Sequence, residues 1–142
     1  MKALSKSLFI LGSVSALSFG ACVHSQNSAQ AKNQESLIQH VSPKQVPMMF
    51  RVNPDIIILD VRTPLEYKRG HMDGAVSLNY ASFKFKSRLA KLDKDAAYLV
   101  HCKSGHRSMF ATKAMERAGF TTIYEMDGGY DGWKKRAQKP SP

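Results

Sequence analysis

Cysteine is scarce in this sequence: only Cys22 and Cys102 occur among 142 residues. Two cysteines are too few for the disulfide framework that holds many small secreted domains together. If Cys22 is removed or modified, as its surroundings indicate below, Cys102 has no partner within the chain. A fold held together by disulfides is therefore excluded, and an oxidising compartment would threaten the thiolate of Cys102.

Acidic residues are scarce too, and the chain has no long run of residues with the same charge. The chain has 21 Lys and Arg residues against 11 Asp and Glu, which gives a formal net charge of +10. The basic residues are scattered, with no run of five or six like charges and no internal repeat. We therefore predict a single domain of modest size and no nucleic-acid partner. The densest basic group fits a solvated face, and it comprises Lys84, Lys86, Arg88, Lys91 and Lys94.

No apolar run is long enough to predict a membrane span, and the longest one lies at the N-terminus. Lys2 and Lys6 form a short positive region, and Leu8–Phe19 is apolar except for Ser and Gly. This order is typical of a secretory signal peptide, whose apolar region is shorter than a membrane-spanning helix. A buried N-terminal helix is the alternative, but the polar stretch that follows argues against it. We predict a signal peptide over residues 1–21.

Two cleavage sites compete after this segment. The sequence "FGAC" resembles a bacterial lipobox, in which the cysteine becomes the lipidated N-terminus, although Phe19 stands where leucine is usual. The rival is "AQA", Ala29–Ala31, which follows the small-x-small rule of ordinary signal peptidase but lies far from the apolar run. We favour lipidation at Cys22. This predicts a lipid-anchored protein on the periplasmic side of the bacterial cell envelope rather than a free periplasmic one.

Composition divides the rest of the chain into a tether, a domain and a tail. Residues 22–35 are polar and cannot bury enough surface to fold, so we predict a flexible tether. The folded domain is expected over residues 36–138, with a C-terminal tail over 139–142. Near its start, Ser42 is a candidate helix N-cap before Pro43, although the helix can also begin nearer Pro47.

Short apolar runs and amphipathic segments alternate along this domain. The run "IIILDV", residues 56–61, is unbroken and β-branched, as in a strand buried on both faces of a parallel sheet. Thr63 and Pro64 are typical of a helix start, and Gly119 of a helix end. The alternation predicts an α/β fold with a central, mainly parallel sheet flanked by helices. Further strands are expected over 74–79, 96–101 and 121–126, and further helices over 83–92, 107–118 and after the glycine turn at 128–129.

The stretch "HCKSGHRS", residues 101–108, places Cys102 directly after a buried strand and shortly before a helix. Ligands of parallel sheets bind outside the carboxyl ends of strands, and the amides of a helix N-terminus favour an anion there. A thiolate in such a loop has a lowered pKa, and Gly105 lets the loop turn tightly. A buried, inert cysteine is the alternative, but these polar neighbours are poor core formers. The residues expected to bind or stabilise an anion are Lys103, Ser104, Gly105, His106 and Arg107, with a hydroxyl group from Ser108.

Local chemistry alone does not choose among phosphate, arsenate and sulfur oxyanions as the ligand of this loop. Three motifs over residues 42–136, however, resemble the rhodanese family of sulfurtransferases and occur in the family's order. They are "LDVRTPLEYKRGHMDGAVSLN", "HCKSGHRS" and "MDGGYDGW". The resemblance implies a small rhodanese-like α/β domain that transfers sulfur through a persulfide on Cys102, without a cofactor or metal. The implied partners are an anionic donor such as thiosulfate, or a persulfide, and a thiol or cyanide-like acceptor.

The resemblance also implies roles for supporting residues. Arg107 would brace the loop through a carboxylate, for which Asp60 and Glu66 are the candidates. Arg62 is a candidate for binding the anionic donor. The other motif residues are expected to be structural, around the loop or in the core, and they are Asp60, His71, Gly74 and Trp133.

Loop length separates two related chemistries. The spacing from Cys102 to Arg107 is C-x4-R, whereas phosphatases and arsenate reductases that resemble rhodaneses have C-x5-R, which cradles a larger tetrahedral anion. The shorter loop favours a single sulfur atom on the cysteine. The alternatives are a phosphatase-like or arsenate-reductase-like enzyme, and a non-enzymatic module for sulfur relay or binding.

Overall fold

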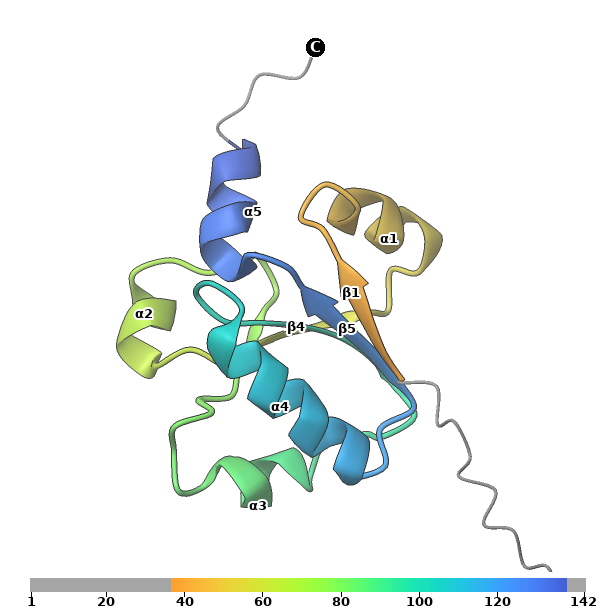
Figure 1. The fold of residues 1–142 in the computed structure, drawn as a ribbon, viewed down its shortest axis with the longest axis vertical. Coiled ribbons are helices and arrows are strands. Elements are labelled where there is room, and N and C mark those ends of the chain that lie inside the picture. Colours follow the sequence, from red (N-terminus) through yellow and green to blue (C-terminus); the bar gives the residue numbers. More distant parts are fainter. Residues whose placement is uncertain (1–36, 138–142) are drawn as a thin grey trace, which may run out of the picture. The chain divides into compact units, whose positions relative to one another are not determined.

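Five parallel strands form the centre of the domain. The computed structural model describes residues 37–137, and the sheet has the order β1-β5-β4-β2-β3 (Figure 1). Every neighbouring pair of strands runs parallel, which confirms the predicted α/β class with a parallel central sheet. The strands are β1 (Ile38–Val41), β2 (Ile57–Asp60), β3 (Val76–Ser77), β4 (Ala97–His101) and β5 (Thr122–Met126).

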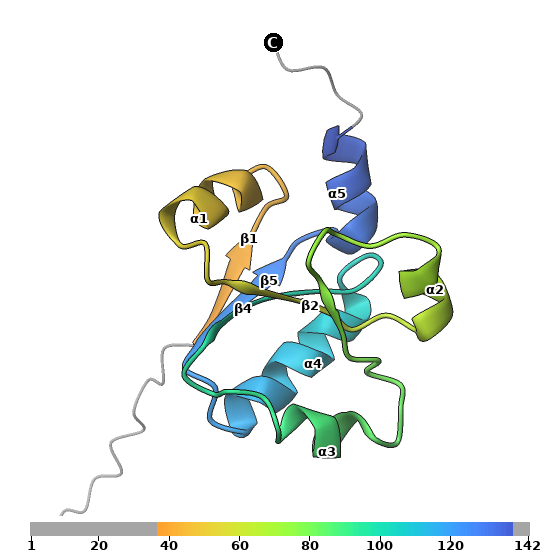
Figure 2. The same ribbon diagram turned by 180° about the vertical axis from the view of Figure 1, so that it is seen from behind.

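Helices cover both faces of this sheet. Helices α3 and α4 lie against one face, and α1 and α5 lie against the other (Figures 1 and 2). Because successive side chains of a strand point to opposite faces, Leu59 packs in the core under α4 while Ile58 packs in the core under α1. The predicted basic group around α3 is exposed, as expected of a solvated face. The helices are α1 (Val46–Val52), α2 (Pro64–Lys68), α3 (Phe85–Leu89), α4 (His106–Arg117) and α5 (Gly129–Ala137).

The capping signals in the sequence predict the start of α2 correctly. For α1 they allow two starting points, and only the later one is correct. Thr63 caps α2: its hydroxyl accepts from the Glu66 N–H, and the Glu66 carboxylate accepts from the Thr63 N–H at 2.9 Å. Ser42 does not cap α1, because its N–H and hydroxyl both donate to Gln45 Oε1 at 2.8 Å. The helix begins at Val46, so the later start near Pro47 is the correct one. Pro47 then lies in the first turn, where a missing N–H removes no helix bond.

The strand and helix pattern was wrong in two places. Nothing in it predicts β1, because this edge strand has only four residues, IQHV, and lacks an apolar run. The helix expected over 83–92 covers only Phe85–Leu89, because the residues before it form a turn in which the Phe85 N–H donates to the Ser82 carbonyl. Neither difference alters the order of the central strands that position the cysteine loop.

The N-terminal segment and the C-terminal tail lie outside the described residues. The signal peptide over 1–21, lipidation at Cys22, the tether over 22–35 and the tail over 139–142 therefore stay predictions. Between residues 37 and 137, no helix is both long and apolar enough to cross a membrane.

Candidate active site

The loop that holds Cys102 joins β4 to α4 at the carboxyl end of the sheet. Cys102 directly follows β4, and α4 begins at His106 with Gly105 as its N-cap. Gly105 has a φ of 107°, in the left-handed region that residues with a side chain rarely adopt. The loop therefore needs glycine here to turn from the strand into the helix within a few residues.

The sulfur of Cys102 lies inside this loop. The residue is 1% exposed, the Gly105 N–H donates to Sγ at 3.2 Å, and the Ser108 hydroxyl lies 3.7 Å from Sγ. Burial of the thiol by itself raises its pKa. Hydrogen bonds from the backbone and hydroxyl of Ser108, and from the amides of Ser104 and Gly105, outweigh burial and bring the pKa of Cys102 below its ordinary value. The loop is thus built to favour a thiolate.

The N-terminus of α5 supports the loop from behind. The Tyr130 N–H donates to the Cys102 carbonyl at 2.8 Å, and the Asp131 N–H donates to the Lys103 carbonyl at 3.0 Å. A Cβ atom on Gly129 would lie 2.5 Å from the Cys102 carbonyl oxygen, so only glycine allows this approach. The glycine pair of the third motif therefore lets α5 satisfy the loop's carbonyl groups, while the loop's own amides face the sulfur.

Arg107 ties the start of α4 to α2. Its guanidinium donates two hydrogen bonds of 2.7 Å to the two oxygens of Glu66, which settles the choice between Glu66 and Asp60 in favour of Glu66. These bonds hold the pKa of Glu66 well below its usual range against the opposing effect of partial burial, and they raise the pKa of Arg107. The nearby Cys102 also raises the pKa of Arg107, so the arginine's charge reaches the sulfur.

Asp60 and Arg62 form a second, deeper pair. Asp60 is fully buried and Arg62 is 4% exposed. The Arg62 Nε donates to both Asp60 oxygens at 2.9 Å, and its Nη2 also donates to the Gly70 carbonyl at 2.8 Å. The guanidinium lies 4.0 Å from the centre of the Tyr130 ring. The hydrogen bonds of Arg62 thus go to protein groups and connect β2 to the segment after α2, while its contact with the Tyr130 ring reaches α5.

Sequence reasoning missed two buried polar residues beside the loop. His101 is fully buried, and its Nδ1 lies 3.2 Å from the Cys102 carbonyl oxygen. Burial lowers the pKa of His101 more than the charge of Asp60 raises it, which favours the neutral ring. Glu125 on β5 is 4% exposed and accepts a hydrogen bond from Ser108 at 2.8 Å. A charged residue inside the otherwise apolar run "TIYEM" is the signal that would have found Glu125.

Two cavities are lined in part by α5, and one of them adjoins the cysteine loop. It has a volume of about 240 Å³, and its lining includes Lys103 and two further exposed cations, Arg69 and Lys134. The predicted loop residues Lys103, Ser104 and His106 are all exposed, whereas Gly105 and Arg107 are partly buried.

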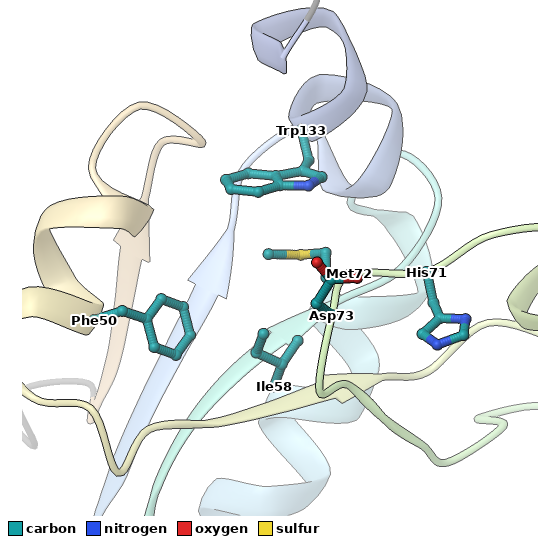
Figure 3. Close-up of a pocket in the computed structure, with 6 residues that line it drawn as sticks. All are labelled: Phe50, Ile58, His71, Met72, Asp73 and Trp133. Carbon is teal, nitrogen blue, oxygen red and sulfur yellow. The ribbon is translucent and has the colours of Figure 1, made fainter.

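The other cavity, of about 320 Å³, lies between α1 and α5, away from the sulfur. Figure 3 shows the Trp133 ring above Met72, with Phe50 on α1 to one side and the His71 ring pointing away. Trp133 therefore packs at the edge of the core under α1, which is one of its two expected places, and not under the loop. His71 instead stacks on Tyr67 with ring centres 3.9 Å apart, a structural contact.

Within residues 37–137, no group of three or more His, Cys, Asp or Glu side chains is arranged to hold a metal ion. Fold and loop together define a small parallel α/β domain built around an activated cysteine. A family model described as a rhodanese-like domain matches residues 42–136, and this chain belongs to that family.

Individual relatives agree with this assignment. The chain is 30% identical over 96 residues to the thiosulfate sulfurtransferase GlpE of Stutzerimonas stutzeri, over 68% of this chain and 84% of GlpE. It is 31% identical over 98 residues to the probable adenylyltransferase/sulfurtransferase MoeZ of Mycobacterium tuberculosis, over 69% of this chain but only 25% of MoeZ, so it spans about a quarter of that relative. A rhodanese-related protein from Thermoplasma volcanium shares the fold, with a TM-score of 0.62 at 20% identity over 72% of this chain and 95% of that one.

Proposed function

We propose that this protein is a sulfurtransferase that carries sulfur as a persulfide on Cys102, from thiosulfate or another persulfide to a thiophilic acceptor. The setting of the sulfur supports this most directly: the Gly105 N–H donates to Cys102 Sγ at 3.2 Å, and the pKa of the thiol is lowered. The similarity to GlpE, named as a thiosulfate sulfurtransferase, supports thiosulfate as the donor.

In the first step, the Cys102 thiolate attacks the outer sulfur of thiosulfate. A bond forms between Sγ and that sulfur, the sulfur–sulfur bond of thiosulfate breaks, and its electron pair leaves with sulfite. The negative charge then lies on the outer sulfur of the Cys102 persulfide. Amides fixed by the loop, including those of Ser104 and Gly105, stabilise this charge without having to reorient.

In the second step, an acceptor such as cyanide or a thiolate attacks the outer sulfur. The new bond gives thiocyanate or an acceptor persulfide, and the electron pair of the broken bond returns to Cys102 Sγ. Because Cys102 leaves as a thiolate, the donors that lower its pKa also make it a better leaving group. One hydrogen-bonded loop thus serves both halves of the cycle.

The cations around the loop fit an anionic donor. Lys103, Arg69 and Lys134 line the cavity of about 240 Å³ beside the loop. A concentration of positive charge at such a mouth raises the local concentration of an anion such as thiosulfate. In this proposal Arg107 acts differently, because its two bonds to Glu66 fix the start of α4 and so the direction of the loop amides.

A thiocyanate assay tests the proposed reaction. The purified protein is mixed with thiosulfate and cyanide, and Cys102→Ser should abolish thiocyanate production. Cys22→Ser removes the only other cysteine and should keep it. Turnover that survives in C102S would contradict the mechanism. Release of phosphate from an aryl phosphate, with no thiocyanate, would instead favour the phosphatase-like alternative.

The location of the protein is a separate proposal. We propose that a lipid on Cys22 anchors the domain at the periplasmic side of the envelope, on the strength of the "FGAC" sequence after an apolar segment. Mass spectrometry of the mature N-terminus tests this. A lipid-modified Cys22 is expected, whereas an unmodified N-terminus at Lys32 would show cleavage after "AQA" and a free periplasmic protein.

A further inference from the structure

A buried carboxylate lies behind the cysteine. Glu125 on β5 is 4% exposed. Its two oxygens accept from hydroxyl groups of α4, from Ser108 Oγ at 2.8 Å and from Thr112 Oγ1 at 3.1 Å. Buried carboxylates usually pair with a cation, but here both partners are neutral. Since Ser108 Oγ also lies 3.7 Å from Cys102 Sγ, a single hydroxyl group separates this acid from the sulfur.

That hydroxyl group has one hydrogen and a choice of acceptors. Around Ser108 Oγ lie Glu125 Oε1 at 2.8 Å, the Gly105 carbonyl oxygen at 2.9 Å and Cys102 Sγ at 3.7 Å. A serine hydroxyl can donate only once. Because bonds to a charged acceptor are shorter and stronger, the Glu125 carboxylate competes with Sγ for this hydrogen and weakens the hydrogen bond of Ser108 to the sulfur.

The charge of Glu125 also distinguishes the two forms of the cysteine. In the free thiolate the negative charge lies on Sγ, next to Ser108. In the persulfide it lies one sulfur–sulfur bond, about 2 Å, further out. Glu125 and Ser108 are both buried and hydrogen-bonded on the side of Sγ that faces β5 and α4, so in this proposal the added sulfur points away from them. Repulsion between like charges weakens with distance, so Glu125 disfavours the thiolate more than the persulfide.

We propose that Glu125 is a positioning residue that acts on Cys102, through Ser108 and through its own charge, to favour the persulfide over the free thiolate. This role rests on the proposed persulfide cycle. The other titratable group in register with Glu125 is His40 on β1, which is exposed and pairs with Asp127 at 3.1 Å. The two side chains that hydrogen-bond to Glu125, Ser108 and Thr112, are neutral, so neither of them neutralises its charge.

Glu125→Gln tests the role because it removes the charge and keeps the shape. The rate of alkylation of Cys102 by iodoacetamide, followed against pH, gives the pKa of the thiol. Mass spectrometry at a fixed ratio of thiosulfate to sulfite gives the ratio of persulfide to free cysteine. In E125Q we expect the thiol pKa to fall by about one unit and the persulfide ratio to fall several-fold.

Two further variants separate this role from simple packing. In a Ser108→Ala background, E125Q should shift the thiol pKa less, because only the direct effect of the charge is left. Thr112→Ser removes one methyl group from the same buried contact but keeps both hydroxyl donors, and it should change neither readout.

Unchanged thiol pKa and persulfide ratio in E125Q would overturn the inference, and equal pKa shifts in both backgrounds would overturn the transmission through Ser108. A wild-type protein that forms no persulfide would refute the proposed function instead. The alkylation profile would still decide, in that case, whether Glu125 acts on the sulfur.

Discussion

The ion pair between Glu66 and Arg107 holds the cysteine loop against α2. A single substitution can remove the charge of Glu66 without changing the shape of the side chain. Glu66→Gln keeps the shape of the side chain and its place in the capping box with Thr63. It removes the charge that Arg107 binds through two bonds of 2.7 Å. The side chains are 28% and 26% exposed, between a surface pair and a buried one. We therefore expect E66Q to lower the free energy of unfolding by about 1–2 kcal/mol at pH 7.

The pH dependence of this loss gives a second test. The bond from Arg107, opposed by partial burial, holds the pKa of Glu66 well below its ordinary value of 4.5. A carboxyl group with a lower pKa in the folded state adds stability above its unfolded pKa, and that stability is lost as the pH falls through the folded pKa. The difference between wild type and E66Q should therefore be complete above about pH 6 and should shrink below about pH 4.

Urea unfolding at pH 7 and at pH 3 measures both effects. For a domain of this size, the melting temperature should fall by about 4–8 °C for each kcal/mol of stability that is lost. Asp131→Asn is a matched control, because its pair with Lys134 is 3.6 Å long and more exposed, and its loss should stay below about 0.5 kcal/mol. A loss in E66Q below about 0.5 kcal/mol at pH 7, or one that is the same at pH 3, would refute the reasoning.

Two further substitutions test the supports around the loop. Gly129→Ala places a Cβ 2.5 Å from the Cys102 carbonyl oxygen, so thiocyanate production should fall by roughly tenfold or more. Gly119→Ala, where no atom lies within 4 Å of the new Cβ, should lower stability but leave turnover intact, and equal losses of turnover in the two variants would contradict a specific effect on the loop. Arg62→Lys removes the fork that binds the buried Asp60, and urea unfolding should show a loss of about 2–3 kcal/mol. A loss under about 0.5 kcal/mol would show that the pair does not hold β2 in place.

The fold and the position of the cysteine could be predicted because both depend on local patterns. The unbroken run "IIILDV" identifies a strand buried on both faces, and burial on both faces requires helices on either side of a parallel sheet. Cys102 then lies at the carboxyl end of such a strand before an amphipathic helix. Each inference needs only a window of neighbouring residues, and the structure confirms both.

The partners of the loop could not be predicted in the same way, because they are distant in sequence. Asp60 and Glu66 are both carboxylates within the first motif, and only the placement of α2 beside the start of α4 decides which one reaches Arg107. Asp60 is already bound to Arg62, which leaves Glu66. The charge within the run "TIYEM" marks Glu125 as unusual, but its role depends on Ser108 facing it from α4, and no local pattern reports that contact.

The contact between α5 and the loop has a consequence for the order of events during synthesis. The carbonyl groups of Cys102 and Lys103 are held by amides of Tyr130 and Asp131, which a ribosome makes more than two dozen residues later. Until those residues have emerged and folded, the loop lacks the amides that hold its two carbonyl groups. The loop around the sulfur is thus completed only after all five strands and the start of α5 have been translated.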